Sequence, residues 1–199
     1  EEAPALRLAR QMIDVFEKAQ VDVIVTNAGG CGSNVREYGY QLRDDPQYAG
    51  RAAAFSAKCK DVSEFLDELG LRSKRHPLNI RVAYHDSCHL QHAQRVRTQP
   101  RTLLAAIPGL ELQDLPEAAL CCGSAGIYNL VQPETADTLA GRKAQLIAAA
   151  HPDVVATGNI GCMLQIGAAI GRNGQQTPVL HTIQLLDASM RGAAVITQK

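Results

Sequence analysis

The chain has 199 residues, 46% of them apolar, which suits one ordinary domain or two small lobes that share an interface. Lysine plus arginine and aspartate plus glutamate both number 20, so the formal net charge is zero. This balance gives no electrostatic reason to expect binding to nucleic acid or to an anionic membrane. No apolar run reaches the roughly 20 residues that span a bilayer, so no transmembrane segment is expected.

The amino-terminal part of the chain predicts helices around one buried strand. Residues 4–19 carry apolar side chains at helical spacing, and residues 21–25 (VDVIV) form a β-branched run that is typical of a buried strand. A glycine-rich turn, TNAGGCGSN, follows and leads into a helix through Tyr40. Residues 47–69 resume the helical spacing, so Cys59 is expected inside a helix as a structural residue.

The rest of the chain continues the alternation of strands and helices. Four short runs predict strands: NIRVAY, GLELQDL, PDVVATG and TPVL. Helices are predicted after the turn HDSCHLQHA, at residues 134–150, and over MLQIGAAIGRNG and HTIQLLDASM. Strands that alternate with helices indicate a mostly parallel sheet covered on both faces. The predicted fold class is α/β.

An internal repeat relates the two parts of the chain. The segment DVIVTNAGGC, from Asp22, resembles DVVATGNIGC, from Asp153. When Asp22 is placed on Asp153, Cys31 falls on Cys162. We therefore expect two related strand–turn–helix units with mostly parallel sheets.

The same repeat suggests where the units begin and end. Downstream, DVSEFLD from Asp61 resembles HTIQLLD from His181, at a slightly smaller offset. We expect residues 1–75 to form the carboxy-terminal part of the first unit, residues 76–192 to form the complete second unit, and residues 193–199 to be a tail. The first unit is expected to be truncated, because the repeat would place a counterpart of the second unit's adjacent cysteines before residue 1.

Four cysteines of the second unit form a widely spaced set: Cys88, the adjacent pair Cys121 and Cys122, and Cys162. Each lies in a predicted loop or at the start of a predicted helix. Because the carboxyl ends of parallel strands meet at one edge of a sheet, such loops converge. A cysteine at a helix amino terminus has a lowered pKa and supplies the thiolate that binds metals. Four thiolates suit a tetranuclear iron–sulfur cluster or a structural zinc ion.

The adjacent pair favours the cluster over zinc. Structural zinc sites usually draw their ligands from C-x₂₋₄-C pairs, and two adjacent cysteines chelate one small ion awkwardly. A cluster presents several iron atoms, which vicinal thiolates can reach separately. The amino end has no signal-peptide pattern, and six cysteines without one favour a reducing, cytoplasmic compartment, where metal or redox chemistry is more common than a disulfide framework.

Several other residues are candidates for the same site. His85 and His89 are additional candidate ligands or proton carriers, with hydrogen bonding to the loop and helix capping as the alternative. Asp86 and Ser87 are expected to cap the helix that opens nearby. Cys31 either completes a second site together with an upstream pair or is a relic of one.

The cysteine segments resemble a known family. YHDSCHL, ALCCGSAG and GNIGCMLQI resemble the cysteine-rich CCG domain, whose pattern is one Cys, a Cys-Cys-Gly and a final C-x-x-C. The stretch from Arg81 to Gly192 is most similar to iron–sulfur subunits of glycolate oxidase. Two positions depart from the pattern, because Asn159 replaces the first cysteine of the final motif and Ala28 stands at the equivalent place in the first unit. Four cysteines remain, which suits an ordinary 4Fe–4S cluster.

The resemblance implies an electron-transfer subunit of a flavin-dependent 2-hydroxyacid dehydrogenase, acting on glycolate or lactate. It implies FAD in partner subunits and not in this chain, a substrate site outside this chain, and an amino-terminal ferredoxin-like domain that this chain lacks. Peripheral association with the inner face of a membrane would occur through those partners.

Two other functions are open on the sequence alone. One is a docking module for the flavin subunits, metal-stabilised or metal-free, without a redox role of its own. The other is a thiol–disulfide enzyme that uses Cys121 and Cys122, which we rank last because adjacent cysteines form only strained disulfides.

Overall fold

The amino-terminal unit is built on one pair of parallel strands. In the computed structural model, which describes residues 2–70 and 72–195, β1 (Ile24–Thr26) pairs with β2 (Cys59–Asp61), with Ile24 opposite Cys59. The helices that the structure describes in this unit are α1 (Glu2–Ala19), α2 (Gly29–Arg36), α3 (Tyr38–Gln41), α4 (Ala49–Lys58) and α5 (Val62–Leu69). Its apolar core includes Ile13 of α1, Ile24 of β1 and Phe55 of α4.

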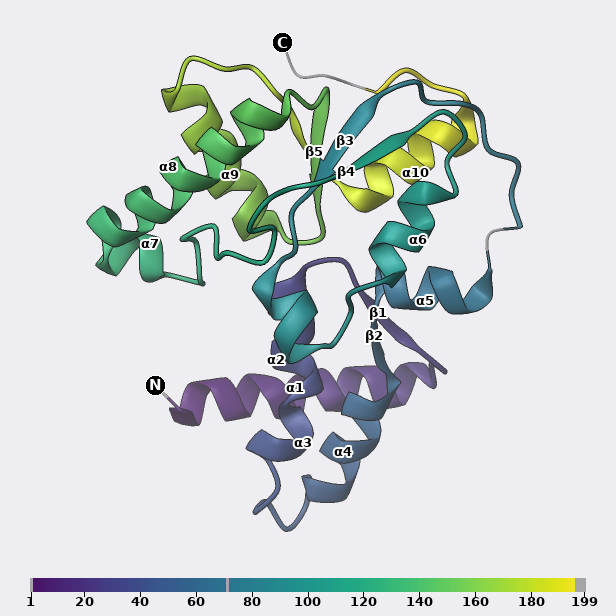
Figure 1. The fold of residues 1–199 in the computed structure, drawn as a ribbon. Coiled ribbons are helices and arrows are strands. Elements are labelled where there is room, and N and C mark those ends of the chain that lie inside the picture. The colour runs from purple at the N-terminus through teal and green to yellow at the C-terminus, as the bar shows by residue number, and fades with distance from the viewer. Residues whose placement is uncertain (1, 71, 196–199) are drawn as a thin grey trace.

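The second unit is a four-stranded sheet with the order β4-β3-β5-β6, and all of its pairs are parallel. This confirms the α/β class (Figure 1). Its elements, in chain order, are β3 (Arg81–Tyr84), the π-helical turn η1 (His89–Ala93), α6 (Gln99–Ala105), β4 (Glu111–Asp114), α7 (Tyr128–Val131), α8 (Pro133–Ala150), β5 (Val154–Thr157), α9 (Ile160–Arg172), β6 (Val179–His181) and α10 (Thr182–Arg191). Of the predicted tail, residues 196–199 lie outside the described residues.

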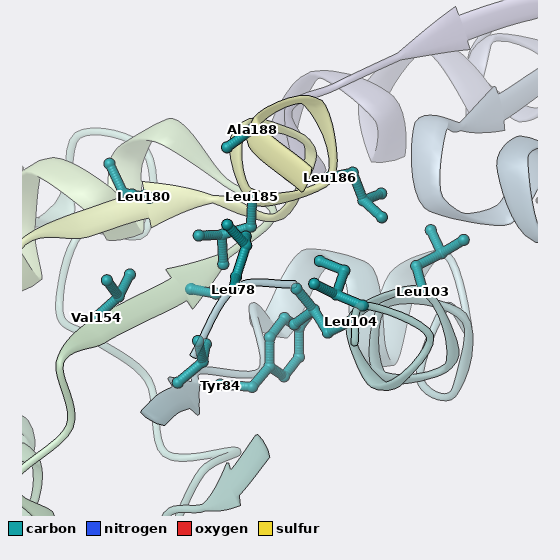
Figure 2. Close-up of a cluster of buried hydrophobic side chains, with 12 residues drawn as sticks. Leu78, Tyr84, Leu103, Leu104, Val154, Leu180, Leu185, Leu186 and Ala188 are labelled. Atoms are coloured by element: carbon teal, nitrogen blue, oxygen red, sulfur yellow. The ribbon is translucent and has the colours of Figure 1, made fainter. Parts of the chain in front are cut away.

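Helices cover both faces of this sheet, as the patterning predicts. Successive side chains of a strand point to opposite faces. Tyr84 and Val154 therefore join the cluster formed with α6 and α10, which Figure 2 shows. Ala83 and Val155 face α8 and α9 on the other side. Each fully buried leucine or isoleucine in these clusters contributes about 1.5–3 kcal/mol through removal of apolar surface from water.

The predicted repeat reappears in the order and length of the elements. When Asp22 is placed on Asp153, α1 coincides with α8 at both ends, and α2 begins where α9 begins. When Asp61 is placed on His181, β2 coincides with β6. The helix after each of these strands opens with a capping box, at Asp61 for α5 and at His181 for α10. The proposed extents of the units, 1–75 and 76–192, remain an interpretation of this repeat.

Two local predictions are wrong. The segment 47–69 is not one helical stretch, because β2 interrupts it and Cys59 is the first residue of that strand. Such a short strand carries no periodic signal, and it forms because β1 provides a partner. The helix predicted through Tyr40 also differs: α2 already begins inside the glycine turn, at Gly29, and the chain breaks at Glu37 before α3.

Candidate metal site

Three loops from neighbouring strands bring the cysteines together. Cys88 follows β3, the Cys121–Cys122 pair follows β4, and Cys162 lies in the first turn of α9 after β5. Because β4, β3 and β5 are adjacent and parallel, all three loops leave the same edge of the sheet. This edge faces α2 of the amino-terminal unit (Figure 1).

The four thiols form a connected row. Cys122 contacts both Cys121 and Cys162, and Cys121 in turn contacts Cys88. The row runs from the interior towards solvent, since Cys122 and Cys162 are each 2% exposed and the other two are partly exposed. The structure thus gathers all four predicted residues, and their role as ligands remains a prediction.

Hydrogen bonding within the row divides the thiols into two kinds. Hydrogen bonds from Cys122 and Cys88 lower the pKa of the Cys121 thiol. The single S–H of Cys122 can face Cys162 instead, and this neighbour lowers the pKa of the Cys162 thiol, opposed by burial and helped by His85 and Asn159. The donors shift the other way, because thiolate neighbours and burial raise the pKa of Cys88 and Cys122. A row of this kind supplies thiolate, the form that binds metals.

The additional candidates are placed differently. The ligand atoms of His85, Cys122 and Cys162 all lie within 4.8 Å of one another, and His85 is 1% exposed. Neither ring nitrogen of His85 has a nitrogen or oxygen partner among the described residues. The Nδ1 atom of His89 lies 3.6 Å from the Cys88 sulfur. Cys31 is exposed in the first turn of α2 and joins none of these contacts in the described chain.

The prediction that Asp86 caps a helix is wrong. Both carboxylate oxygens of Asp86 accept hydrogen bonds from the Arg101 guanidinium, at 2.6 and 2.7 Å, and this pair fixes the loop before Cys88 to α6. Ser87 does not cap a helix either, because its hydroxyl has no partner within the described residues. The position that opens η1 is Cys88 itself. A partner on a separate helix depends on the tertiary fold, which local spacing does not reveal.

Lys143 is a feature that the motifs did not single out. Its side chain is fully buried, and its ammonium group donates to the backbone carbonyls of Glu117 and Ala118 at 2.6 and 3.3 Å. These carbonyls lie just before the Cys-Cys pair, so the side chain fixes the start of that loop. Burial lowers the pKa of Lys143, whereas the nearby charge of Cys122 raises it. The sequence signal was a lysine on the buried face of α8, beside Ala140, Ala144 and Ile147.

Gly123 makes the tight turn after the cysteine pair. Its φ of +89° lies in a region that side chains disfavour, and a Cβ there would stand 2.5 Å from the backbone oxygen of Ala136. The same residue donates its N–H to the Cys121 sulfur at 3.4 Å. The glycine therefore lets the loop pack against α8 while it supports a thiolate.

The donor set fits a thiolate-ligated metal centre. Four sulfurs from three loops converge with the imidazole of His85, whose nitrogens lack other partners among the described residues. Burial of polar groups without a bonding partner costs free energy, and a bound metal would provide that partner. Four thiolates match the usual complement of an iron–sulfur cluster.

Comparison with known proteins defines the class. The chain belongs to the CCG cysteine-rich domain family, whose model matches residues 1–36 and 82–167. It is similar to a probable glycolate oxidase iron–sulfur subunit of Bacillus subtilis (strain 168), with 40% identity over 94% of this chain and 42% of the relative. It is also similar to the glycolate oxidase iron–sulfur subunit of Escherichia coli (strain K12), with 35% identity over 93% of this chain and 45% of the relative.

A shorter relative is matched over most of its length. Lactate utilization protein A of Geobacillus kaustophilus (strain HTA426) is 32% identical over 90% of this chain and 74% of that protein. By contrast, the chain spans less than half the length of the two glycolate oxidase subunits. In the part of the chain that the structure describes, no helix has both the length and the apolar character needed to cross a membrane.

Proposed function

We propose that this chain is an iron–sulfur electron-transfer subunit of a flavin-dependent oxidoreductase that acts on glycolate or a related 2-hydroxyacid. The observation that carries the proposal is the convergence of four cysteine thiols from three loops at one sheet edge. The names of its relatives support the choice of cofactor and substrate class. The cofactor, a 4Fe–4S cluster held by these four thiolates, would supply one-electron transfer when bound.

The residues around the site suit this role. Cys122 and Cys162 form its buried end, from which packed apolar side chains of α8 and α9 exclude water. Cys88 and Cys121 form the partly exposed end, where a redox partner can approach. The ammonium group of Lys143 offsets part of the thiolate charge. His85, and less directly His89 beside Cys88, stay additional candidate ligands.

We place FAD in partner subunits, together with the substrate site, and we place the complex in the cytoplasm. An apolar surface beside the cysteine loop supports a partner there. It consists of Ile127, Leu130 and Val131, within or next to α7, and Leu164 of α9, all of them more than half exposed. A hydrogen bond of 3.1 Å from Asn129 to Gln165 joins α7 to α9, so these side chains belong to one connected surface.

The same apolar surface supports a second candidate function. In this alternative the chain is a docking module for the flavin subunits, and any metal it holds is structural. It predicts a colourless protein that binds its partners and does not change its absorption on reduction.

Anaerobic purification followed by iron, sulfide and zinc analysis and an absorption spectrum separates these functions. The proposal predicts brown protein with stoichiometric iron and sulfide that bleaches on reduction. Cys121→Ala should lose most of this iron, because it removes one thiolate from the row. Cys59→Ala is the matched control and should keep all of it, because Cys59 is buried in β2, where its thiol donates to the carbonyl of Phe55. Colourless protein with zinc or without metal would overturn the redox role.

A further inference from the structure

Asn159 occupies a helix-capping position without capping the helix. It is the N-cap residue of α9, where an asparagine side chain normally accepts a hydrogen bond from the first turn. Within the described chain, its side chain makes no such bond to α9. Instead, both ends of the amide form hydrogen bonds with groups outside the α9 backbone. One of these groups lies in the amino-terminal unit.

The two ends of the amide join the amino-terminal turn to a cysteine. The Oδ1 atom accepts a hydrogen bond from the backbone N–H of Gly30 at 3.2 Å. The Nδ2 group donates to the Cys162 sulfur at 3.3 Å. The orientation follows from chemistry, because a backbone N–H can only donate and so requires the oxygen, which leaves the NH₂ group facing the sulfur.

Other contacts hold the amino-terminal turn in place for this bridge. Gly29 donates its N–H to the carbonyl of Gly158 at 3.1 Å and accepts from the Gln94 side chain at 2.8 Å. Both turns also pack on Leu90 of η1: a Cβ on Gly29 would stand 3.1 Å from its side chain, and a Cβ on Gly158 would stand 2.6 Å from one of its methyl carbons. Asn159 connects these contacts between the two units to the sulfur of Cys162.

We infer that Asn159 is a positioning residue that sets the reduction potential of the centre held at Cys162, and that it does so from the amino-terminal turn. An N–H donated to a ligating sulfur withdraws electron density and stabilises the reduced, more negative state. Gly30 fixes the amide so that its NH₂ group faces the sulfur. The equivalent residue of the first unit is Ala28, whose side chain has no group to donate. This inference rests on the proposed function, since it requires a redox centre at the cysteines.

The direct test is a potentiometric titration of the anaerobically purified protein. Asn159→Ala removes the N–H···S bond and should lower the midpoint potential while iron and sulfide stay stoichiometric. Asn159→Asp should lower it further, because an ionised carboxylate cannot donate and adds negative charge beside the thiolate. Asn129→Ala is the matched control: its amide lies in the same unit and donates to Gln165, so the potential should not move.

A second pair of variants tests the role of the amino-terminal turn without touching the second unit. Gly30→Pro replaces the N–H with a ring carbon that meets the Asn159 oxygen, so it breaks the hydrogen bond and displaces the amide, at a position in the first helical turn where no intrahelical partner is lost. Gly30→Ala keeps the N–H, and its Cβ would lie 3.8 Å from the Asn159 oxygen, an ordinary contact. The proline variant should lower the midpoint potential by less than Asn159→Ala does, and the alanine variant should leave it unchanged.

Failure of this inference is distinguishable from failure of the proposed function. If the wild-type protein holds no iron and sulfide, both the proposed function and this inference are overturned. If it holds them but neither Asn159→Ala nor Gly30→Pro changes the potential, the inference alone is overturned. Amide hydrogen exchange gives an independent readout: Asn159→Ala should speed exchange at Gly30, and Asn129→Ala should not. Unchanged exchange at Gly30 would show that the bridge does not form, which also overturns the inference.

Discussion

The turns after β1 and β5 have similar local structures, but the cysteines that follow them have different surroundings. Each follows a strand, contains glycines and places a cysteine in the first turn of the next helix, Cys31 in α2 and Cys162 in α9. Cys31 is exposed, whereas Cys162 is 2% exposed and contacts other thiols. The strand, turn and helix are therefore not sufficient to make the site.

The neighbourhood of each turn accounts for this contrast. In the amino-terminal unit, the structure pairs β1 only with β2 among the described residues. In the second unit, β5 has β3 beside it and β4 next in order, and the loops after these strands deliver Cys88 and the Cys121–Cys122 pair. A common turn thus gains a cluster of thiols when adjacent parallel strands bring further cysteines to the same edge.

The strongest effect should separate the two equivalent cysteines. Cys162→Ala should lose most of the bound iron and sulfide, because it removes a thiolate from the buried end of the row. Cys31→Ala should retain the full complement, because its thiol lies outside the row. Metal and sulfide analysis of the anaerobically purified variants checks both. Iron loss in the Cys31 variant would undo the contrast and place the first turn inside the site.

A second effect concerns the ion pair that fixes the first cysteine loop. Asp86→Ala should destabilise the protein by about 3 kcal/mol, because it leaves the partly buried Arg101 with a longer contact, of 3.8 Å to the exposed Asp114, as its remaining carboxylate partner. Asp153→Ala removes an exposed pair with Arg81, together with a hydrogen bond from the Arg81 backbone N–H, and should cost less. Urea unfolding of both variants measures the difference. Equal losses of stability in the two variants would contradict the view that the Asp86–Arg101 pair fixes the loop before Cys88.

A third, smaller effect tests the loop that carries the adjacent cysteines. Gly123→Ala should cost about 2 kcal/mol, since it combines a left-handed backbone with a Cβ that meets the backbone of Ala136. Gly126→Ala should cost about 1 kcal/mol, because φ is +67° but the space is open. Thermal unfolding of the two variants ranks them. The reverse order would show that packing against α8 does not fix this loop.

The weakest effect concerns the equivalent capping residues, His181 and Asp61. Burial lowers the pKa of His181, so its contribution to stability is present above about pH 6.5 and is lost as the pH falls through its folded pKa. Burial raises the pKa of Asp61, so its contribution is present below about pH 3.9 and is lost as the pH rises through its folded pKa.

Replacement of each by asparagine keeps a capping side chain that cannot titrate. The advantage of the wild type over His181→Asn should therefore shrink as the medium is acidified below about pH 6.5. Its advantage over Asp61→Asn should shrink in the opposite direction, as the pH rises above about 3.9. Denaturant unfolding at a series of pH values measures both trends, and parallel trends in the two variants would contradict the opposite signs.

The sequence predicted most of the architecture because its signals are local or repeated. Apolar runs indicated β3 and β5, helical spacing indicated α1 and α8, and the repeat related the two units. The four cysteines were found by their spacing and by the rule that loops after parallel strands converge. The resemblance to the CCG domain family then favoured an iron–sulfur cluster over zinc.

The features that were missed depend on partners distant in sequence. β2 forms because β1 lies beside it, and so short a strand shows no period. Asp86 pairs with Arg101 on another element, where local spacing predicted a cap. Lys143 shows itself only as a charge on a buried helix face, and its partners lie before the cysteine pair, on a loop that precedes α8.

Iron-edge X-ray absorption on the anaerobically purified or reconstituted protein would test most directly whether the four cysteines hold a cluster. We expect iron surrounded by sulfur, with further iron atoms in the next shell, as a cluster held by Cys88, Cys121, Cys122 and Cys162 requires. Iron bound by nitrogen and oxygen without neighbouring iron, or zinc in its place, would contradict this expectation.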